Sequence, residues 1–87
     1  MLAPKNQTDD YNTMIDYGIY AIENSHQKSN TPYTDANHRH GFMIVYGWSG
    51  GNRPIQLLIL GEADGVSISV RSWVPSGFTS WRKVSFS

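Results

Sequence analysis

The sequence predicts a mainly β fold: a small antiparallel sheet with one short helical turn near the N-terminus. Segment Ile55–Trp73 contains two apolar runs that flank a short acidic loop with glycine at both ends, a pattern typical of a β-hairpin. Residues 66–71 alternate between apolar and polar, as expected for a strand with one buried and one solvated face. The chain has 87 residues, which is enough for one small domain.

The other elements can be placed in chain order. Segment 1–8 is polar and aperiodic, so we expect a linker or shaft tether there and a β domain over residues 9–87. Asp9 or Asp10 can cap a short helical turn. The turn should place three apolar residues on one face, namely Tyr11, Met14 and Ile15. Five strands are expected, at Gly18–Glu23, Gly41–Gly47, Ile55–Leu60, Val66–Trp73 and Trp81–Phe86.

The two arms of the central hairpin are predicted to have different roles. The apolar residues of Val66–Val70 share one face, so this arm should pack the protomer's own core. The arm Ile55–Leu60 is apolar on both faces, and such a strand is normally covered on both. In so short a chain we expect the second cover to come from another subunit, and the sequence therefore favours a homo-oligomer.

Composition argues against several classes of partner. The formal net charge is zero with histidine neutral, and the largest basic cluster is Arg82-Lys83, so we expect neither nucleic acid nor an anionic membrane as a partner. The longest apolar runs fall far short of the roughly 20 residues that a membrane helix needs, so no membrane insertion is expected. Cysteine is absent, which excludes disulfides and thiol chemistry.

Six pieces of the sequence, taken in order, form a recognisable series: Asp10–Tyr20, Asn30–Pro32, Gly41–Val45, Ile55–Leu57, Val70–Ser72 and Phe78–Val84. This series resembles the knob domains of phage tail fibres and R-type pyocin tail fibres. Those domains combine an apolar lead-in, an Asn-x-Pro-like loop and a glycine-led strand. A glutamine-led strand, an arginine near the end of the next strand and a closing tryptophan complete their pattern. Two departures are that Arg82-Lys83-Val84 follows Trp81, where the family often has a second tryptophan, and that Asn24–Asn30 is a long polar insert.

The resemblance implies a small β-rich knob that is trimeric about a fibre axis. Its partners would be two further copies of itself, as a homotrimer, and a bacterial surface polysaccharide or another receptor. Its location would be the virion or an extracellular contractile particle, and its role would be binding to the host surface. Two alternatives stay open: a purely structural trimerisation or spacer module of the fibre, and a carbohydrate-binding appendage of a tail-associated depolymerase.

Aromatic residues in loops and at strand ends suggest a carbohydrate-binding surface. Exposed rings can stack on the apolar faces of sugars, while amide and guanidinium groups bond to sugar hydroxyls. The candidate ligand-binding residues are Tyr33, Trp48, Asn52 and Arg53. Trp73 and Trp81 are instead expected to cover the thin core.

One pair of residues has metal-like spacing. His38 and His40 lie two positions apart, so in an extended segment their side chains share a face and could chelate one ion. Three copies around an axis would offer six imidazoles, but exposed loop histidines are the favoured interpretation, and no cofactor is predicted. The acidic residues fall near turns and strand ends, with no spacing that builds a two-carboxylate cleft, so we expect no enzyme activity.

Overall fold

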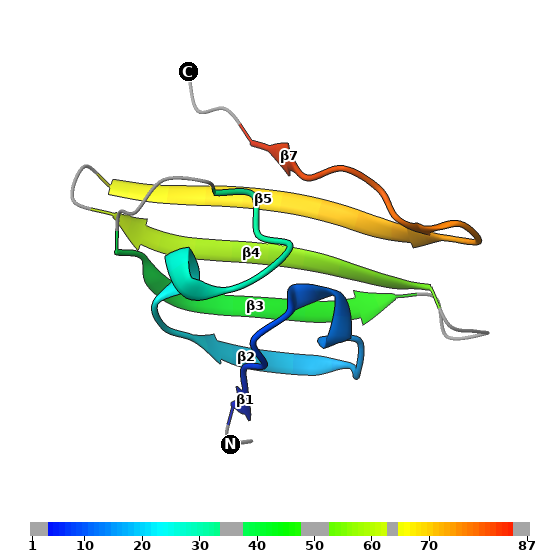
Figure 1. Ribbon diagram of the computed structural model, residues 1–87, viewed down its shortest axis with the longest axis horizontal. Helices are drawn as coiled ribbons and strands as arrows, with labels where there is room; N and C mark the ends of the chain where they lie inside the picture. The colour runs from blue at the N-terminus through cyan, green and yellow to red at the C-terminus, as the bar shows by residue number, and fades with distance from the viewer. Residues whose placement is uncertain (1–3, 34–37, 48–52, 63–64, 85–87) are drawn as a thin grey trace.

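The computed structural model describes residues 4–33, 38–47, 53–62 and 65–84 and confirms a mainly β fold. The described strands form one sheet in the order β1-β2-β3-β4-β5-β6, with β7 also paired to β5 (Figure 1). The elements are β1 (Lys5–Asn6), η1 (Tyr11–Thr13), β2 (Gly18–Ile22), η2 (Ser25–Gln27), β3 (His40–Gly47), β4 (Pro54–Glu62), β5 (Gly65–Val74), β6 (Gly77–Phe78) and β7 (Arg82–Lys83).

The four long strands are β2, β3, β4 and β5, and they lie where the sequence predicts them. Each pairs with its neighbour in antiparallel register. The short strand β1 pairs in parallel with β2, so this part of the expected tether contacts the domain. The closing strand is seen at β7, and the last two residues of its predicted range lie outside the described residues. No described helix is both long and apolar enough to cross a membrane.

The predicted helical turn is present as the 3₁₀ helix η1. Asp10 is its N-cap, and the Asp10 carboxylate accepts a hydrogen bond from the backbone N–H of Asn12 at 2.9 Å. Tyr11 and Met14 are fully buried, as predicted. The prediction that Ile15 shares their face is wrong. Because the helix ends at Thr13, the chain has turned toward β2 by Ile15, whose side chain is exposed.

The hydrophobic core lies on one face of the sheet, which we call the covered face. Both short helices and the segments around them lie over this face, on the viewer's side in Figure 1. The helical segment and the loop after η2 contribute side chains that pack against alternate residues of β2, β3 and β4. The buried cluster consists of Tyr11, Met14, Tyr20, Ile22, Tyr33, Met43, Val45, Leu58 and Leu60, with Trp81 packed against it.

The prediction that the apolar side of β5 packs the protomer's own core is wrong. Ser69 pairs with Leu58 and Arg71 with Gln56, so both residues lie on the covered face and are buried. Val66 lies on the opposite face and is 59% exposed. The physical reason is that β4 buries Gln56 beside Leu58, and a polar residue of β4 requires a polar partner on β5.

Candidate functional site

The face of the sheet opposite the core carries a continuous apolar surface, which we call the open face. Strand alternation and the pairing register place apolar or aromatic residues side by side on all four long strands. One row across the sheet, for example, pairs Ile19 with Ile44, Ile44 with Leu57 and Leu57 with Val70. The open face consists of Tyr17, Ile19, Phe42, Ile44, Tyr46, Ile55, Leu57, Ile59, Val66, Ile68 and Val70.

Several open-face side chains are substantially exposed. The most exposed is Tyr46, at 66%, and its ring lies 5.2 Å from the ring of Tyr17. Beside it is a shallow apolar groove of about 360 Å³, lined by Ile44, Tyr46, Gly47, Ile55 and Leu57. The six most exposed members, three of them aromatic, are 38–66% exposed, so together they leave on the order of several hundred Å² of mainly apolar surface in solvent. The largest apolar patch on a soluble monomer is often functional, so the open face is a candidate interaction site.

A polar network lies beneath the core on the covered face. The Gln56 side-chain N–H₂ donates to the backbone carbonyls of Tyr11 at 2.7 Å and Met14 at 2.9 Å. The Arg71 Nε–H donates to the Gln56 side-chain oxygen at 2.7 Å. Gln56 therefore ties the end of η1 to the centre of the sheet and also holds the arginine of the next strand.

The guanidinium of Arg71 is surrounded by aromatic rings. Its Cζ lies 4.0 Å from the ring centre of Phe78 and 4.4 Å from that of Trp81. Burial lowers the pKa of Arg71 to about 10, and the charge of Asp10 partly opposes that shift. The Arg71 Nη2 is buried and makes no hydrogen bond with the described residues. Within the part of the chain that the structure describes, this strong donor has no acceptor.

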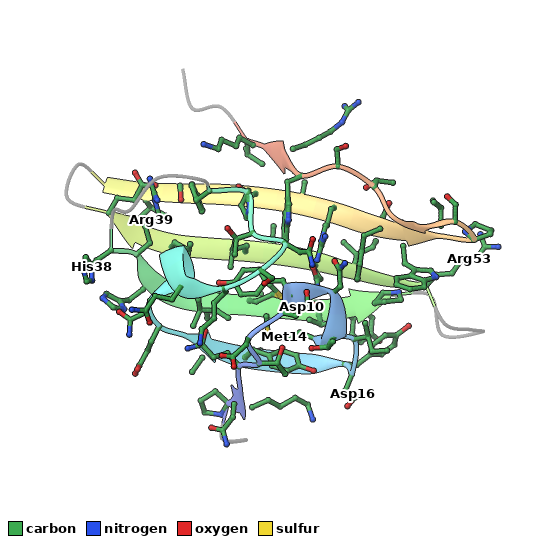
Figure 2. The ribbon with its side chains drawn as sticks, viewed as in Figure 1. Asp10, Met14, Asp16, His38, Arg39 and Arg53 are labelled. Carbon is green, nitrogen blue, oxygen red and sulfur yellow. The ribbon has the colours of Figure 1, made fainter. Side chains whose placement is uncertain are left out.

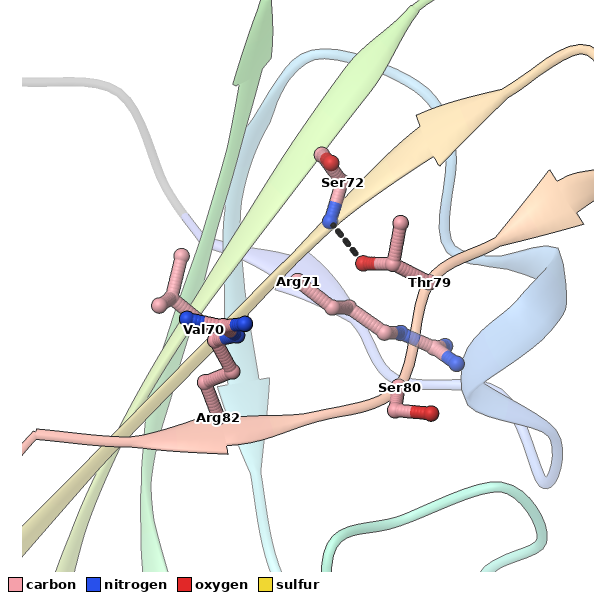
Figure 3. Close-up of a pocket in the computed structure, with 6 residues that line it drawn as sticks. All are labelled: Val70, Arg71, Ser72, Thr79, Ser80 and Arg82. Atoms are coloured by element: carbon pink, nitrogen blue, oxygen red, sulfur yellow. Dashed lines mark hydrogen bonds between the residues drawn. The ribbon is translucent and has the colours of Figure 1, made fainter.

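A pocket of about 480 Å³ lies beside this arginine, between β5 and segment 79–82. Two hydrogen bonds close one end of it: the Thr79 N–H donates to the Ser72 carbonyl at 2.8 Å, and the Ser72 N–H donates to the Thr79 hydroxyl at 3.1 Å. Figure 3 shows Arg71 and Arg82 extending in different directions from this opening. The pocket is lined by Val70, Arg71, Ser72, Thr79, Ser80 and Arg82.

The predicted ligand-binding residues do not form one site in the described structure. Tyr33 is buried, and its hydroxyl is hydrogen-bonded to the Ser67 hydroxyl near the start of β5. Arg53 is exposed and immediately precedes β4, at the other end of the sheet (Figure 2). Trp48 and Asn52 lie outside the described residues. Their ligand-binding role stays a prediction.

The Tyr33 ring is occupied by cations of the protein itself. The Arg39 guanidinium carbon lies 3.9 Å from the ring centre and the Lys83 Nζ 4.8 Å from it. Arg39 also donates from Nε to a Glu62 carboxylate oxygen at 2.8 Å. A sugar could stack on Tyr33 only by displacing one of these contacts, so the ring serves the structure in this conformation.

Trp73 and Trp81 lie against other aromatic rings rather than in open loops. Trp81 packs on the core at 6.5 Å from the Tyr11 ring, and its indole N–H donates to the Asn30 carbonyl at 2.9 Å. Trp73 meets Phe78 edge to face at 4.9 Å. Trp81 therefore covers the core as predicted, and it joins the loop after η2 to the C-terminal segment. The same prediction for Trp73 is wrong, because Trp73 packs against Phe78 and is not among the residues packed on the core cluster.

The two histidines with metal-like spacing are both exposed, near the start of β3. The rings of His38 and His40 lie 6.5 Å apart, and the backbone N–H of Asn24 donates to His40 Nδ1 at 3.3 Å. Within the described residues, no group of three or more histidine, aspartate or glutamate side chains is placed to hold a metal ion. Metal binding through several copies of the chain stays a prediction.

Acidification is expected to weaken the link between Arg39 and Glu62. The hydrogen bond from Arg39 is the main reason that the pKa of Glu62 lies below its ordinary value of 4.5. The folded-state pKa of Glu62 lies below its ordinary value. This contribution to the free energy of unfolding is therefore fully present above the ordinary value of 4.5 and is lost as pH falls through the folded-state pKa. The free energy of unfolding in urea should therefore differ more between the parent protein and Glu62→Gln at about pH 6 than at about pH 3. An equal difference in the free energy of unfolding at both pH values would contradict a stabilising contact between Arg39 and Glu62.

Comparison with known proteins identified no relative: no family model matches the chain, and no match was found among curated proteins or solved structures.

Proposed function

We propose that the protein is an oligomeric β-sheet module of a fibre that binds a bacterial surface, of the phage tail fibre or R-type pyocin knob type. The observation that carries the proposal is the open face. A sheet with its core on one side and a continuous apolar surface on the other is half of a larger hydrophobic core. Copies of the same chain would complete that core at the fibre axis.

The size and chemistry of the open face support self-association. A stable interface buries about 800 Å² per partner, and the exposed apolar surface of the open face approaches that value. The row of Ile19, Ile44, Leu57 and Val70 across the four long strands contains no charged side chain, and Arg82, which pairs with Val70 at the outer edge, would lie at the polar rim of the interface. Closed symmetric assembly about one axis, as in a trimer, would bury this surface on every copy without leaving a free apolar edge.

The residues that carry the family resemblance also support the proposal. Gln56, Arg71 and Trp81 belong to three separate pieces of the resembling pattern, and in the structure they form one contact network. A network of this kind explains why a glutamine, an arginine and a tryptophan would recur together in one fold. It builds the framework, so it leaves the choice of receptor to loops and edges.

Receptor binding falls to surfaces that assembly at the open face leaves exposed. The exposed residues at the sheet ends, among them Arg53, and the edge pocket beside Arg71 keep polar groups in solvent. Polysaccharide recognition needs hydroxyl, amide and guanidinium groups of this sort. The proposed location is a virion or an extracellular contractile particle, and the proposed activity is binding without a chemical step.

Oligomeric mass and cell binding together test the proposal. Sedimentation equilibrium of the purified protein should give a trimer, and the fluorescently labelled protein should bind bacterial cells in a saturable way. A monomer at all concentrations would overturn the assembly. A trimer that binds none of a panel of bacteria would instead identify a structural spacer, and a monomer that binds soluble polysaccharide would fit an appendage of a depolymerase.

A further inference from the structure

The pairing register along the outer edge of β5 changes by one residue. Trp73 pairs with Phe78, whereas Val70 pairs with Arg82. As a result, two residues of the C-terminal segment, Ser80 and Trp81, lie opposite the single residue Arg71. An extra residue on one strand of an antiparallel pair is a β-bulge, and bulges re-aim side chains and are enriched beside functional sites.

The bulge accounts for the pocket beside β5. Between the hydrogen bonds of Ser72 with Thr79 and the pairing of Val70 with Arg82, the C-terminal segment separates from the strand. The resulting opening of about 480 Å³ lies within the range of sites for small ligands, 300–1,000 Å³. Figure 3 shows Ser80 and Thr79 along one side of it and β5 along the other.

The lining of this opening is positively charged. Arg82 pairs with Val70 and belongs to the side of the open face, whereas Arg71 belongs to the covered face, so the two arginines approach the edge from opposite sides. Three hydroxyl side chains complete the polar lining, and no described lining residue is acidic. Arg82 is exposed and can move to meet a ligand.

Arg71 places a buried positive charge beside the opening. It is only 7% exposed, it is held by Gln56, and its Nη2 lacks a hydrogen-bond partner among the described residues. A buried charge is costly unless an opposite charge or sufficient hydrogen bonds compensate it. Among the described residues Asp10 acts on it through space, and neither described ion pair includes it. An anion in the opening would bring a further opposite charge close to this arginine.

We propose that this opening binds the carboxylate of an acidic sugar, such as a uronate residue of a bacterial surface polysaccharide. The proposal rests on the proposed function and names the class of its receptor. One accessible guanidinium fork, that of Arg82, matches a planar carboxylate of single charge, and Arg71 supports it from within the protein. Ser72, Thr79 and Ser80 line the same opening and would supply hydroxyl groups for the sugar hydroxyls.

Titration with defined oligosaccharides tests the site. In two-dimensional NMR, trigalacturonate is expected to shift the backbone signals of Ser72, Thr79 and Ser80, whereas neutral maltotriose leaves them unchanged. Arg82→Gln is expected to weaken trigalacturonate binding at least tenfold, and Arg82→Lys should restore it only in part because lysine lacks the fork. Tighter binding of inorganic phosphate than of trigalacturonate at the same residues would overturn the carboxylate assignment.

Arg53→Gln is the matched control. It removes one exposed arginine at the end of the sheet, outside the pocket, and should leave trigalacturonate binding unchanged. Equal loss of binding in Arg53→Gln and Arg82→Gln would show a diffuse charge effect and overturn the site. Because Arg82 is exposed, thermal unfolding of its variants should match that of the parent protein. If the protein is a trimer and binds cells but does not bind trigalacturonate, this inference is wrong and the proposed function is unaffected.

Discussion

Gln56→Leu is expected to lower the free energy of unfolding by about 4 kcal/mol, one of the two largest effects predicted for this chain. Leucine has nearly the volume of glutamine, so the change creates little cavity. It removes three hydrogen bonds at once: two to the backbone carbonyls of Tyr11 and Met14 and one from the Arg71 Nε–H. The Met14 carbonyl and the Arg71 Nε–H would each lose this buried partner, at a cost of roughly 1–3 kcal/mol per group, whereas the Tyr11 carbonyl would keep the Met14 N–H at 3.3 Å.

Equilibrium urea unfolding measures this loss, and Gln7→Leu is the matched control. Among the described residues, the Gln7 side chain makes one hydrogen bond, to the Glu23 carbonyl at 2.8 Å, and that bond is exposed, while its Oε1 has no partner among them. Its loss should therefore cost about 1 kcal/mol or less, since water can replace the partner. If the two variants lose the same stability, Gln56 is not the centre of the network described above.

The network also shows what could be read from the sequence and what could not. The apolar runs and glycine-bounded loops located the four long strands, because hydrophobic periodicity is a property of each segment by itself. The prediction of which face of β5 is buried is wrong, because alternation shows that the two faces of a strand differ without showing which one is inside. Pairing with Gln56 and contact with Trp81 decide that Arg71 is buried, and both partners are distant in sequence.

One signal in the sequence pointed to the correct face. Gln56 is the one polar residue within Ile55–Leu60, and its spacing of two places it on the same face of the strand as Leu58 and Leu60. A glutamine in step with a strand's buried set predicts a polar partner on the neighbouring strand, which is Arg71. By contrast, no local pattern could show that Tyr33 would be occupied by Arg39 and Lys83, since those contacts depend on how the loop folds over the sheet.

The other large effect is expected at the open face, where Ile55→Lys should raise the dissociation constant of self-association at least about 100-fold. This prediction rests on the proposed assembly. Ile55 is 46% exposed and lies between Tyr46 and Ser72 in the sheet. In the single chain a lysine there can extend its ammonium into water, so folding should be preserved. In an assembly built on the open face, every copy would bury that charge without a partner.

Ile15→Lys is a closely matched control for this change. Ile15 is the same residue type with the same 46% exposure, but it lies outside the strands, between η1 and β2. If the open face drives association, sedimentation equilibrium should show the parent mass for Ile15→Lys and a shift toward monomer for Ile55→Lys. Unfolding midpoints of both variants, measured as isolated chains at low concentration, should agree. Equal dissociation of the two variants would mean that general apolar exposure, rather than the sheet face, holds the copies together.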